Sequence, residues 1–230
     1  MDIRIKELIA GAKEAEGLTV IIDVLRAFSL EAYLFHQGAE RSYTIGDTDT
    51  ALKLKAEHPD WIMIGERGGK MIDGADFGNS PCEFEGMDLT GKTIIHTTSA
   101  GTQGIVNATG ASEIIVGALV NADAVAAYIK DKNPDVVTLC AMGNAGVRRA
   151  NEDLLCAEYI KSVLEGHPID VQAEADKLPT NGAEHFFDPN QPQYPEPDFW
   201  RCIRCNTLNL VIGVDKTPEG LYTGTLRQGG

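Results

Sequence analysis

The sequence contains no apolar run that approaches the roughly 18 residues a membrane-spanning helix needs. Residues Met1–Glu7 mix both charges and lack the apolar core of a secretory signal peptide. Basic residues are scarce, because 20 Lys and Arg stand against 34 Asp and Glu, a net charge of −14. Such an acidic chain is a poor partner for nucleic acid or an anionic membrane. We therefore expect neither partner.

Cysteine is also sparse, with five scattered residues. An odd, scattered set without a signal peptide is typical of a reducing compartment, so we expect a cytoplasmic protein. Cys202 and Cys205 have CxxC spacing, but no second pair lies within zinc-finger range. Their role is left open.

Apolar runs alternate with helical patterns along most of the chain. This alternation predicts an α/β fold with a largely parallel sheet, built as one domain or two small lobes. Strands are expected at 18–22, 41–45, 61–64, 93–96, 113–116 and 136–140. Helices are expected at 27–37, 48–57, 121–130 and 151–165.

The character of the sequence changes after Gly166. Residues 181–197 are rich in Pro, Asn and acids, which predicts a long loop or lid. A last strand is expected at 208–214, followed by an edge segment and a frayed tail at 221–230. We expect a single domain over 1–230, with 166–230 as a C-terminal subdomain or lid.

Polar side chains follow four of the expected strands. Asp23 follows the first, Glu66 and Arg67 the third, and Thr97-Thr98 the next, while a Gly-Asn loop follows the strand that ends at Cys140. Ligands bind at the carboxyl ends of the strands in open α/β sheets. The sequence therefore predicts a functional site at that edge.

The residue types indicate phosphate or sulfonate chemistry with a divalent cation. Asp23 could bind a metal or attack phosphorus, with Arg26 neutralising the anion. Glu66 or Asp76 could hold the cation, and Arg67 could bind an anion with two parallel hydrogen bonds. Asp23 could equally be a helix cap with a local Arg partner.

Two further segments allow more than one interpretation. Thr97–Thr102 offers hydroxyl and backbone N–H groups at a helix start, as in an anion site or an ordinary cap. Glu152 and Asp153 lie in the first turn of an expected helix, where the helix dipole alone favours acidic residues. Alternatively, they could supply further magnesium ligands. Among the histidines, His96 is the first candidate for the site and His185 the second.

Six separate blocks resemble the 2-phosphosulfolactate phosphatase family in order and approximate spacing. The blocks are Asp23–Ala27, Gly65–Gly69, Gly74–Pro81, Thr97–Thr102, Asn121–Val125 and Glu152-Asp153. The resemblance covers roughly residues 18–165 and implies a mixed sheet flanked by helices in three layers. It also implies a magnesium-dependent phosphatase that converts 2-phospho-3-sulfolactate to 3-sulfolactate and phosphate on a route to coenzyme M.

Site residues carry over by matching position. Those implied for catalysis are Asp23, Arg26, Glu66 and Arg67. Those implied for Mg²⁺ are Asp23, Glu66, Asp76, Glu152 and Asp153. Those implied for the small anionic substrate are Asn79, Ser80, Thr98, Gly101, Thr102 and Asn121. A homodimer is one option for the assembly.

The sequence departs from the family pattern in three places. Phe28 precedes Ser29 after the first block, and Ser99-Ala100 lacks the usual asparagine. Arg148–Asn151 replaces the usual Phe-Ser-Leu before Glu152. These changes leave open a phosphatase of another small 2-phosphorylated acid, or a non-catalytic sulfonate- or phosphate-binding protein. The nucleophile is water or Asp23, with water favoured because Leu25 stands where a second Asp would be expected.

Overall fold

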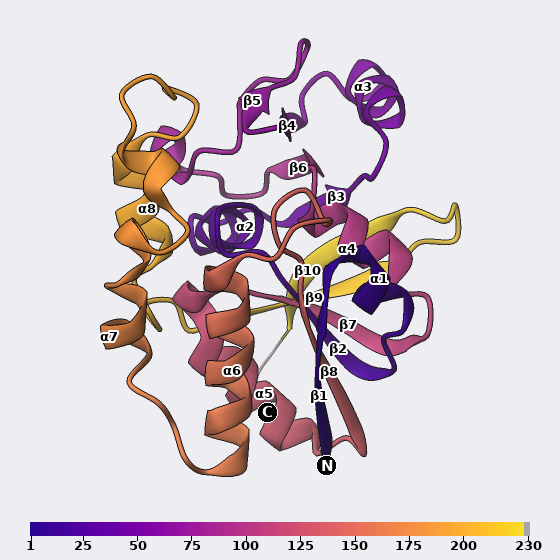
Figure 1. Cartoon of the computed structure of the whole chain (residues 1–230). Helices are drawn as coiled ribbons and strands as arrows, with labels where there is room; N and C mark the ends of the chain where they lie inside the picture. Colours follow the sequence, from indigo (N-terminus) through magenta and orange to yellow (C-terminus); the bar gives the residue numbers. More distant parts are fainter. Residues whose placement is uncertain (228–230) are drawn as a thin grey trace.

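The fold is built around one mixed sheet. A computed structural model describes residues 1–227. In these residues ten strands form a sheet with the order β1-β8-β2-β7-β9-β10-β3-β6-β4-β5 (Figure 1). The sheet consists of two parallel blocks joined by an antiparallel hairpin. The expected α/β fold with a mixed, largely parallel sheet is confirmed.

The first block has two largely apolar strands at its centre. It comprises β1 (Asp2–Glu7), β8 (Val136–Ala141), β2 (Gly17–Ile22) and β7 (Ala111–Gly117), all parallel. Val20, Ile21 and Ile22 are fully buried in succession, so both faces of β2 are covered. This is the pattern of a central strand in a parallel sheet.

The second block is smaller. It comprises β3 (Arg41–Thr44), β6 (Thr93–Thr97) and β4 (Ile62–Arg67), with the short antiparallel β5 (Lys70–Met71) at its edge. The hairpin β9 (Val211–Lys216) and β10 (Tyr222–Arg227) fills the gap between the blocks. There β9 pairs with β7 and β10 pairs with β3, both antiparallel.

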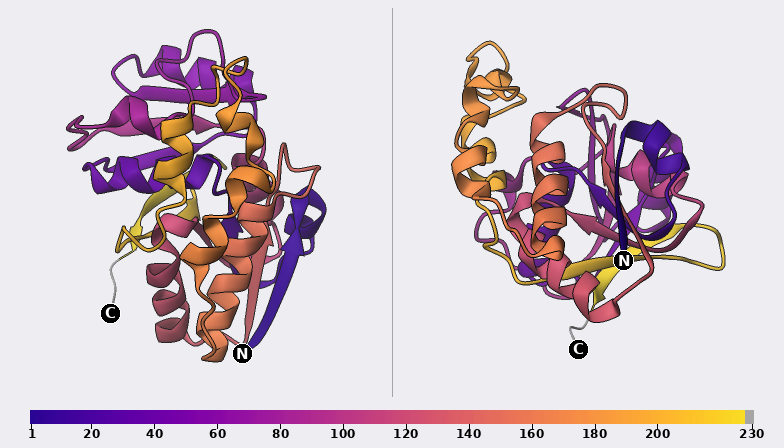
Figure 2. Two further views of the ribbon diagram at one scale, coloured as in Figure 1. Left: turned by 60° about the vertical axis from the view of Figure 1, so that its left-hand side comes forward. Right: turned by 60° about the horizontal axis from the view of Figure 1, so that its bottom comes forward.

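Helices cover both faces of the sheet (Figures 1 and 2). One side carries α2 (Ala27–His36), α5 (Ala122–Lys132) and α6 (Asn151–Glu165), and the other carries α1 (Leu8–Lys13), α3 (Thr48–Glu57) and α4 (Gly101–Asn107). Leu30 of α2 shares a buried cluster with Ile64 of β4, while Ala51 of α3 shares another with Met63. Because successive strand residues face opposite sides, these clusters lie on the two faces of one strand.

The segment after α6 contains more helix than its composition suggests. It forms α7 (Val171–Ala175), 3₁₀ helices at Leu178–Thr180 and Glu184–Phe187, and α8 (Glu196–Cys202). In the views of Figure 2 this segment runs beside α6 and then past α2. The subdomain or lid expected over 166–230 stays a prediction, and residues 228–230 lie outside the described part of the chain.

Two expectations about the strands need correction. Residues 61–64 were expected as a strand ending before a loop, but β4 continues to Arg67 because Glu66 and Arg67 pair with Met71 and Lys70. The segment expected at an edge, 221–230, instead contributes an interior strand, since β10 pairs on both sides. Neither pairing leaves a signal in the apolar pattern of the strand itself. No helix among residues 1–227 is long and apolar enough to cross a membrane.

The position of Gly224 in β10 generates a stability prediction. Gly224 lies opposite Ser42 and Val214, and a Cβ atom there would come within 2.5 Å of Ser42 Oγ and 2.9 Å of Glu31 Oε1. We expect Gly224→Ala to lower the free energy of unfolding by about 1–3 kcal/mol through overpacking. Urea denaturation would measure it, with Leu226→Ala, exposed on the same strand, as the control. Equal stability of both variants would contradict this packing.

Candidate active site

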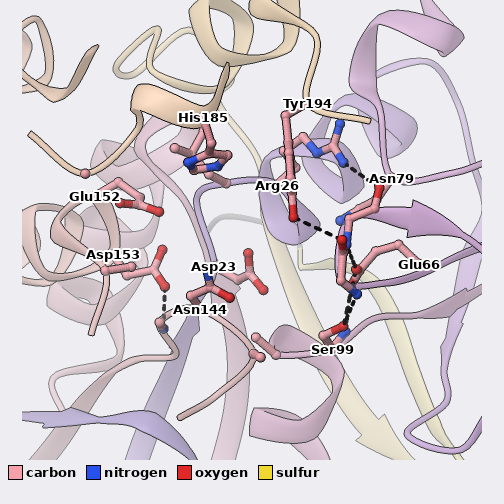
Figure 3. A pocket seen from close by; sticks show the side chains of 18 of the residues that line it. Asp23, Arg26, Glu66, Asn79, Ser99, Asn144, Glu152, Asp153, His185 and Tyr194 are labelled. Atoms are coloured by element: carbon pink, nitrogen blue, oxygen red, sulfur yellow. Dashed lines mark hydrogen bonds between the residues drawn. The ribbon is translucent and has the colours of Figure 1, made fainter. Parts of the chain in front are cut away.

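A polar pocket lies at the carboxyl ends of strands from both blocks (Figure 3). Asp23 follows β2, Glu66 is the penultimate residue of β4, Ser99 follows β6, and the loop after β8 leads to Glu152 and Asp153. In Figure 3, Asp23, Glu152 and Asp153 gather on one side, with Glu66 and Ser99 opposite. The pocket therefore brings the two parallel blocks into one site, at the edge expected for ligands.

Asp23 is held at the start of α2. Its Oδ1 accepts a hydrogen bond from the Ala27 backbone N–H at 3.2 Å. Burial, together with the nearby carboxylate of Asp153 and the more weakly acting Glu66, raises the pKa of Asp23 to about 8. Gly101 lies so close that a Cβ atom there would be 2.9 Å from Asp23 Oδ2. Position 101 therefore requires glycine, because a side chain there would be too close to the Asp23 carboxylate.

Asp153 joins the ends of β2 and β8. Its Oδ1 accepts from the Val24 N–H and its Oδ2 from the Gly143 N–H, both at 2.7 Å. Burial and the adjacent Glu152 raise its pKa to about 8 even though these N–H groups lower it. Both oxygens are engaged, so Asp153 acts chiefly by fixing the two loops that carry Asp23 and Asn144.

Glu152 differs from its neighbour. Its carboxylate makes no side-chain hydrogen bond to another residue within the described part of the chain, although the side chain is buried and lines the pocket. Burial first, and then the charge of Asp23, raise the pKa of Glu152 to about 7. A residue present only for the helix dipole would be solvated. The structure therefore leaves Glu152 free to bind a ligand.

Glu66 connects two loops of the second block. Its Oε1 accepts from the Ser99 N–H at 2.6 Å and its Oε2 from the Gly69 N–H at 2.7 Å. The Ser99 hydroxyl adds a contact of 3.2 Å to Oε2. Like Asp153, Glu66 uses its carboxylate to hold backbone at the rim of the pocket.

Arg26 forms a buried ion pair that the sequence analysis did not identify. Its Nη1 donates to Asp198 Oδ2 at 2.6 Å, and the side chains are only 4% and 0% exposed. Asp198, on α8, also accepts from Ser80 Oγ at 2.8 Å and Cys82 N at 3.1 Å. One aspartate therefore joins α8, Arg26 and the loop before the 3₁₀ helix Pro81–Phe84.

The C-terminal segment covers the pocket with His185 and Tyr194 (Figure 3). The Tyr194 hydroxyl donates to Gly68 O at 3.1 Å, and its ring lies 5.4 Å from the Arg26 guanidinium. A Cβ atom on Gly69 would be 2.3 Å from that ring, so the turn approaches it closely. Burial and the charge of Arg26 lower the pKa of His185, which favours the neutral imidazole. His185 was the second of two histidine candidates, and the structure brings it to the pocket.

The first candidate, His96, lies elsewhere. It is fully buried, with Nδ1 3.1 Å from Glu31 Oε2. It does not line the pocket.

Arg67 and Asp76 do not reach the pocket. Since β4 continues through Glu66 and Arg67, the Arg67 side chain faces away from the side on which Glu66 lies. Its guanidinium donates to Glu66 O at 2.6 Å and Thr97 Oγ1 at 2.9 Å. The Asp76 carboxylate accepts from the Met63 N–H at 2.7 Å and lies 2.7 Å from Lys55 Nζ. The roles expected of these two residues are therefore corrected to structural ones.

Some residues expected to bind substrate line the pocket, and others support the fold around it. Asn79 lines the pocket, and its buried Oδ1 has no hydrogen-bond partner among the described residues. Thr98 and Thr102 are hydrogen-bonded to each other, because the backbone N–H of each donates to the hydroxyl of the other. Asn121 accepts from Ala118 N at 3.0 Å and donates to Leu210 O. Ser80 is bound to Asp198, so these last four support the fold around the site.

Only part of the expected acidic set fits Mg²⁺. Within residues 1–227, no three or more His, Cys, Asp or Glu side chains are arranged closely enough to enclose a metal ion. Asp23 and Glu152 keep accepting capacity toward the pocket, whereas Glu66 and Asp153 are committed to backbone N–H groups. Mg²⁺ commonly binds through one or two carboxylates, with water and substrate phosphate completing its octahedron. The pair Asp23 and Glu152 suits that mode.

A family model described as 2-phosphosulpholactate phosphatase matches residues 3–185. The chain belongs to this family. The family name denotes phosphoric monoester hydrolases, and the match includes every carboxylate described above except Asp198.

Several relatives carry the name probable 2-phosphosulfolactate phosphatase. The Bacillus subtilis protein is 32% identical over 206 residues, which cover 88% of this chain and 89% of that protein. The Thermoplasma acidophilum protein is 30% identical over 194 residues, or 84% of each chain. The Carboxydothermus hydrogenoformans protein is 39% identical over 153 residues, 66% of this chain and 63% of that protein.

The crowded carboxylates predict a stability that depends on pH when metal is absent. Asp23, Glu152 and Asp153 have raised pKa values of about 8, 7 and 8 in the folded chain. The folded state therefore holds protons that the unfolded chain has lost, so the free energy of unfolding falls as pH rises from about 4 to about 8.

The variant Asp23→Asn keeps the Oδ1 acceptor but removes the charge. In EDTA we expect its Tm to exceed that of the native chain by about 3 °C or more at pH near 8, with a smaller difference near pH 5. Thermal melts at both pH values would measure this. A lower Tm than the native chain near pH 8 would contradict it.

The buried ion pair generates a second prediction. Asp198→Asn leaves the Arg26 charge buried without compensation, which we expect to cost about 3 kcal/mol or more in the free energy of unfolding. Activity should fall as well, because Arg26 lines the pocket. Glu196→Gln, exposed on the same helix, is the matched control. Chemical denaturation and phosphate release would test both variants, and native behaviour of Asp198→Asn would refute the role of the pair.

Proposed function

We propose that the chain is a magnesium-dependent phosphatase that hydrolyses 2-phospho-3-sulfolactate to 3-sulfolactate and phosphate, a step of coenzyme M or sulfolactate metabolism. The family membership supports the substrate class. The observation that carries the proposal is the pair of buried carboxylates, Asp23 and Glu152, which face one pocket together with Arg26.

Asp23 and Glu152 are the residues that would hold Mg²⁺. The ion would neutralise negative charge on the phosphoryl oxygens and on these acids. This need is strong here, because the pocket of a chain with net charge −14 must accept a polyanion. The raised pKa values of the same carboxyls are consistent with a site that is incomplete without a cation.

Three groups of the chain are available for the substrate itself. Arg26 uses Nη1 for Asp198, and its longer contact from Nη2 to Gly69 O, at 3.4 Å, leaves that edge able to bind a phosphoryl oxygen. Asn79 contributes a buried amide with an unpartnered oxygen. His185 lines the pocket from the C-terminal segment. Because its pKa is lowered, it is the neutral group best suited to exchange a proton there. The His185 and Tyr194 rings pack edge to face in the pocket wall, with centroids 4.6 Å apart.

Water is favoured as the nucleophile over Asp23. Asp23 is a carboxylate that would hold Mg²⁺, and its Oδ1 accepts the Ala27 N–H, so attack on phosphorus would require it to move away from both partners. A water molecule that forms the new P–O bond as the ester P–O bond breaks needs no such movement. Its proton can pass to His185, and the departing alkoxide regains a proton to give 3-sulfolactate.

Phosphate release from 2-phosphosulfolactate is the direct test. We expect release with Mg²⁺, loss of release in EDTA, and a fall of about 100-fold or more for Asp23→Asn and for Glu152→Gln, since each removes a charge from the cation site. Asp131→Asn, on the exposed face of α5, is the control.

Other results would contradict the proposal in distinct ways. Release only from other 2-phosphorylated acids would indicate a phosphatase of another small acid. Binding of 2-phosphosulfolactate and Mg²⁺ by a folded protein without any release would indicate a non-catalytic binding protein. Full activity of Glu152→Gln would remove Glu152 from the metal site.

A further inference from the structure

A second hollow adjoins the acidic pocket on its outer side. It is lined by Asn144, Arg148, Arg149, His185, Gln191 and Tyr194, and we call these six residues the rim subsite. Four of them, Asn144, Arg149, His185 and Tyr194, also line the acidic pocket. The two hollows are therefore adjacent, with these four side chains between them.

The two hollows differ in charge, although Arg26 and Arg149 also line the acidic pocket. Four carboxylates line the acidic pocket, namely Asp23, Glu66, Glu152 and Asp153. The rim subsite contains no carboxylate, but it has two guanidinium groups and two side-chain amides. A ligand with anionic groups at both ends would need a cation in the first hollow and would find positive charge already present in the second.

The two arginines of the rim subsite are not equivalent. Arg149 is already paired, since its Nε and Nη2 donate to the two carboxylate oxygens of Glu7 at 2.5 and 2.6 Å. The Arg148 guanidinium has no ion pair and no side-chain hydrogen bond to any residue in 1–227. Arg148 is therefore the positive charge available to a ligand.

The backbone of Arg148 is fixed even though its side chain is exposed. Its N–H donates to Asn144 O at 3.1 Å and its carbonyl accepts from Asn144 N at 2.7 Å. Gly143 packs so closely that a Cβ atom there would be 2.2 Å from Arg148 O, and Gly143 N is bound by Asp153. The loop that presents Arg148 is thus attached to the same carboxylate that positions the acidic pocket.

The C-terminal segment supplies the opposite wall. Gln191 Nε2 donates one hydrogen bond, to Asp188 Oδ2 at 3.1 Å, and its second N–H is available. Tyr194 lines the same hollow as Arg148 and Gln191. A ligand group between Arg148 and Gln191 would meet donors from both sides.

We propose that Arg148 and Gln191 bind the sulfonate of a substrate whose phosphate lies in the acidic pocket. The proposal rests on the function proposed above and assigns its specificity to the rim subsite. A sulfonate stays charged at every physiological pH and presents three oxygens. Two can accept parallel hydrogen bonds from a guanidinium, and the third can accept from an amide.

A comparison of two substrates tests the assignment. 2-Phospholactate lacks the sulfonate of 2-phosphosulfolactate but keeps its phosphate and carboxylate. For Arg148→Ala we expect KM for 2-phosphosulfolactate to rise about tenfold or more, because a charge-assisted contact is lost. The kcat should stay within about threefold, and both constants for 2-phospholactate should be unchanged. Arg148→Lys should recover part of the loss, since it keeps the charge but not the paired donors.

Arg41→Ala serves as the control for net charge, because Arg41 is exposed at the amino end of β3, away from both hollows. An unchanged KM for 2-phosphosulfolactate in Arg148→Ala would overturn the proposal. An equal rise in KM for both substrates would also overturn it, because Arg148 would then act on the shared groups.

Product binding separates failure of this inference from failure of the proposed function. If the native chain releases no phosphate, calorimetric titration with 3-sulfolactate and with lactate still tests the subsite. Preferential binding of 3-sulfolactate that Arg148→Ala loses would support the subsite without turnover. Equal binding of 3-sulfolactate by the native chain and Arg148→Ala would overturn it.

Discussion

The structure depends on the burial of several carboxylates at one end of the sheet. Burial of charge is costly unless hydrogen bonds or counter-charges compensate. Here backbone N–H groups provide much of the compensation, with Val24 and Gly143 on Asp153, Gly69 and Ser99 on Glu66, and Ala27 on Asp23. Each carboxylate therefore determines the path of the loops beside it, and the loops determine the shape of the pocket.

This arrangement divides the acids into two kinds. Asp153 and Glu66 join loops from different parts of the chain and keep little accepting capacity for a ligand. Asp23 and Glu152 are oriented by these loops and remain open toward the pocket. The Arg26 guanidinium likewise has one edge that supports the fold and one that faces the site. Asp198 binds the first edge in a buried ion pair, and the other edge faces the pocket.

Much of the site edge could be predicted from the sequence. Buried parallel strands are apolar along their length, so a polar residue directly after one, such as Asp23, marks the carboxyl end of the sheet. The same rule placed Glu66 correctly. It failed for Arg67, because β4 continues through both residues and the alternation of strand side chains sends them to opposite faces.

Long-range partners could not be predicted in this way. Asp198 lies 172 positions from Arg26, directly after the segment 181–197 whose composition predicts a loop. The neighbours of Asp76 in sequence favour a metal ligand, but its Oδ2 contacts Lys55 and the Met63 N–H, and Asp76 does not line the pocket. Such pairings are set by packing between elements and leave no periodicity in a single sequence. The interior position of β10 was missed for the same reason.

The hairpin of β9 and β10 affects the order in which the sheet can form during synthesis. It lies between β7 and β3, yet its residues, 211–227, follow every other strand in the chain. During synthesis each parallel block can begin to form alone, but the sheet cannot close until this last hairpin leaves the ribosome. Until then β7 and β3 each keep an unpaired edge, where the nascent chain is most exposed to wrong pairing and to chaperones.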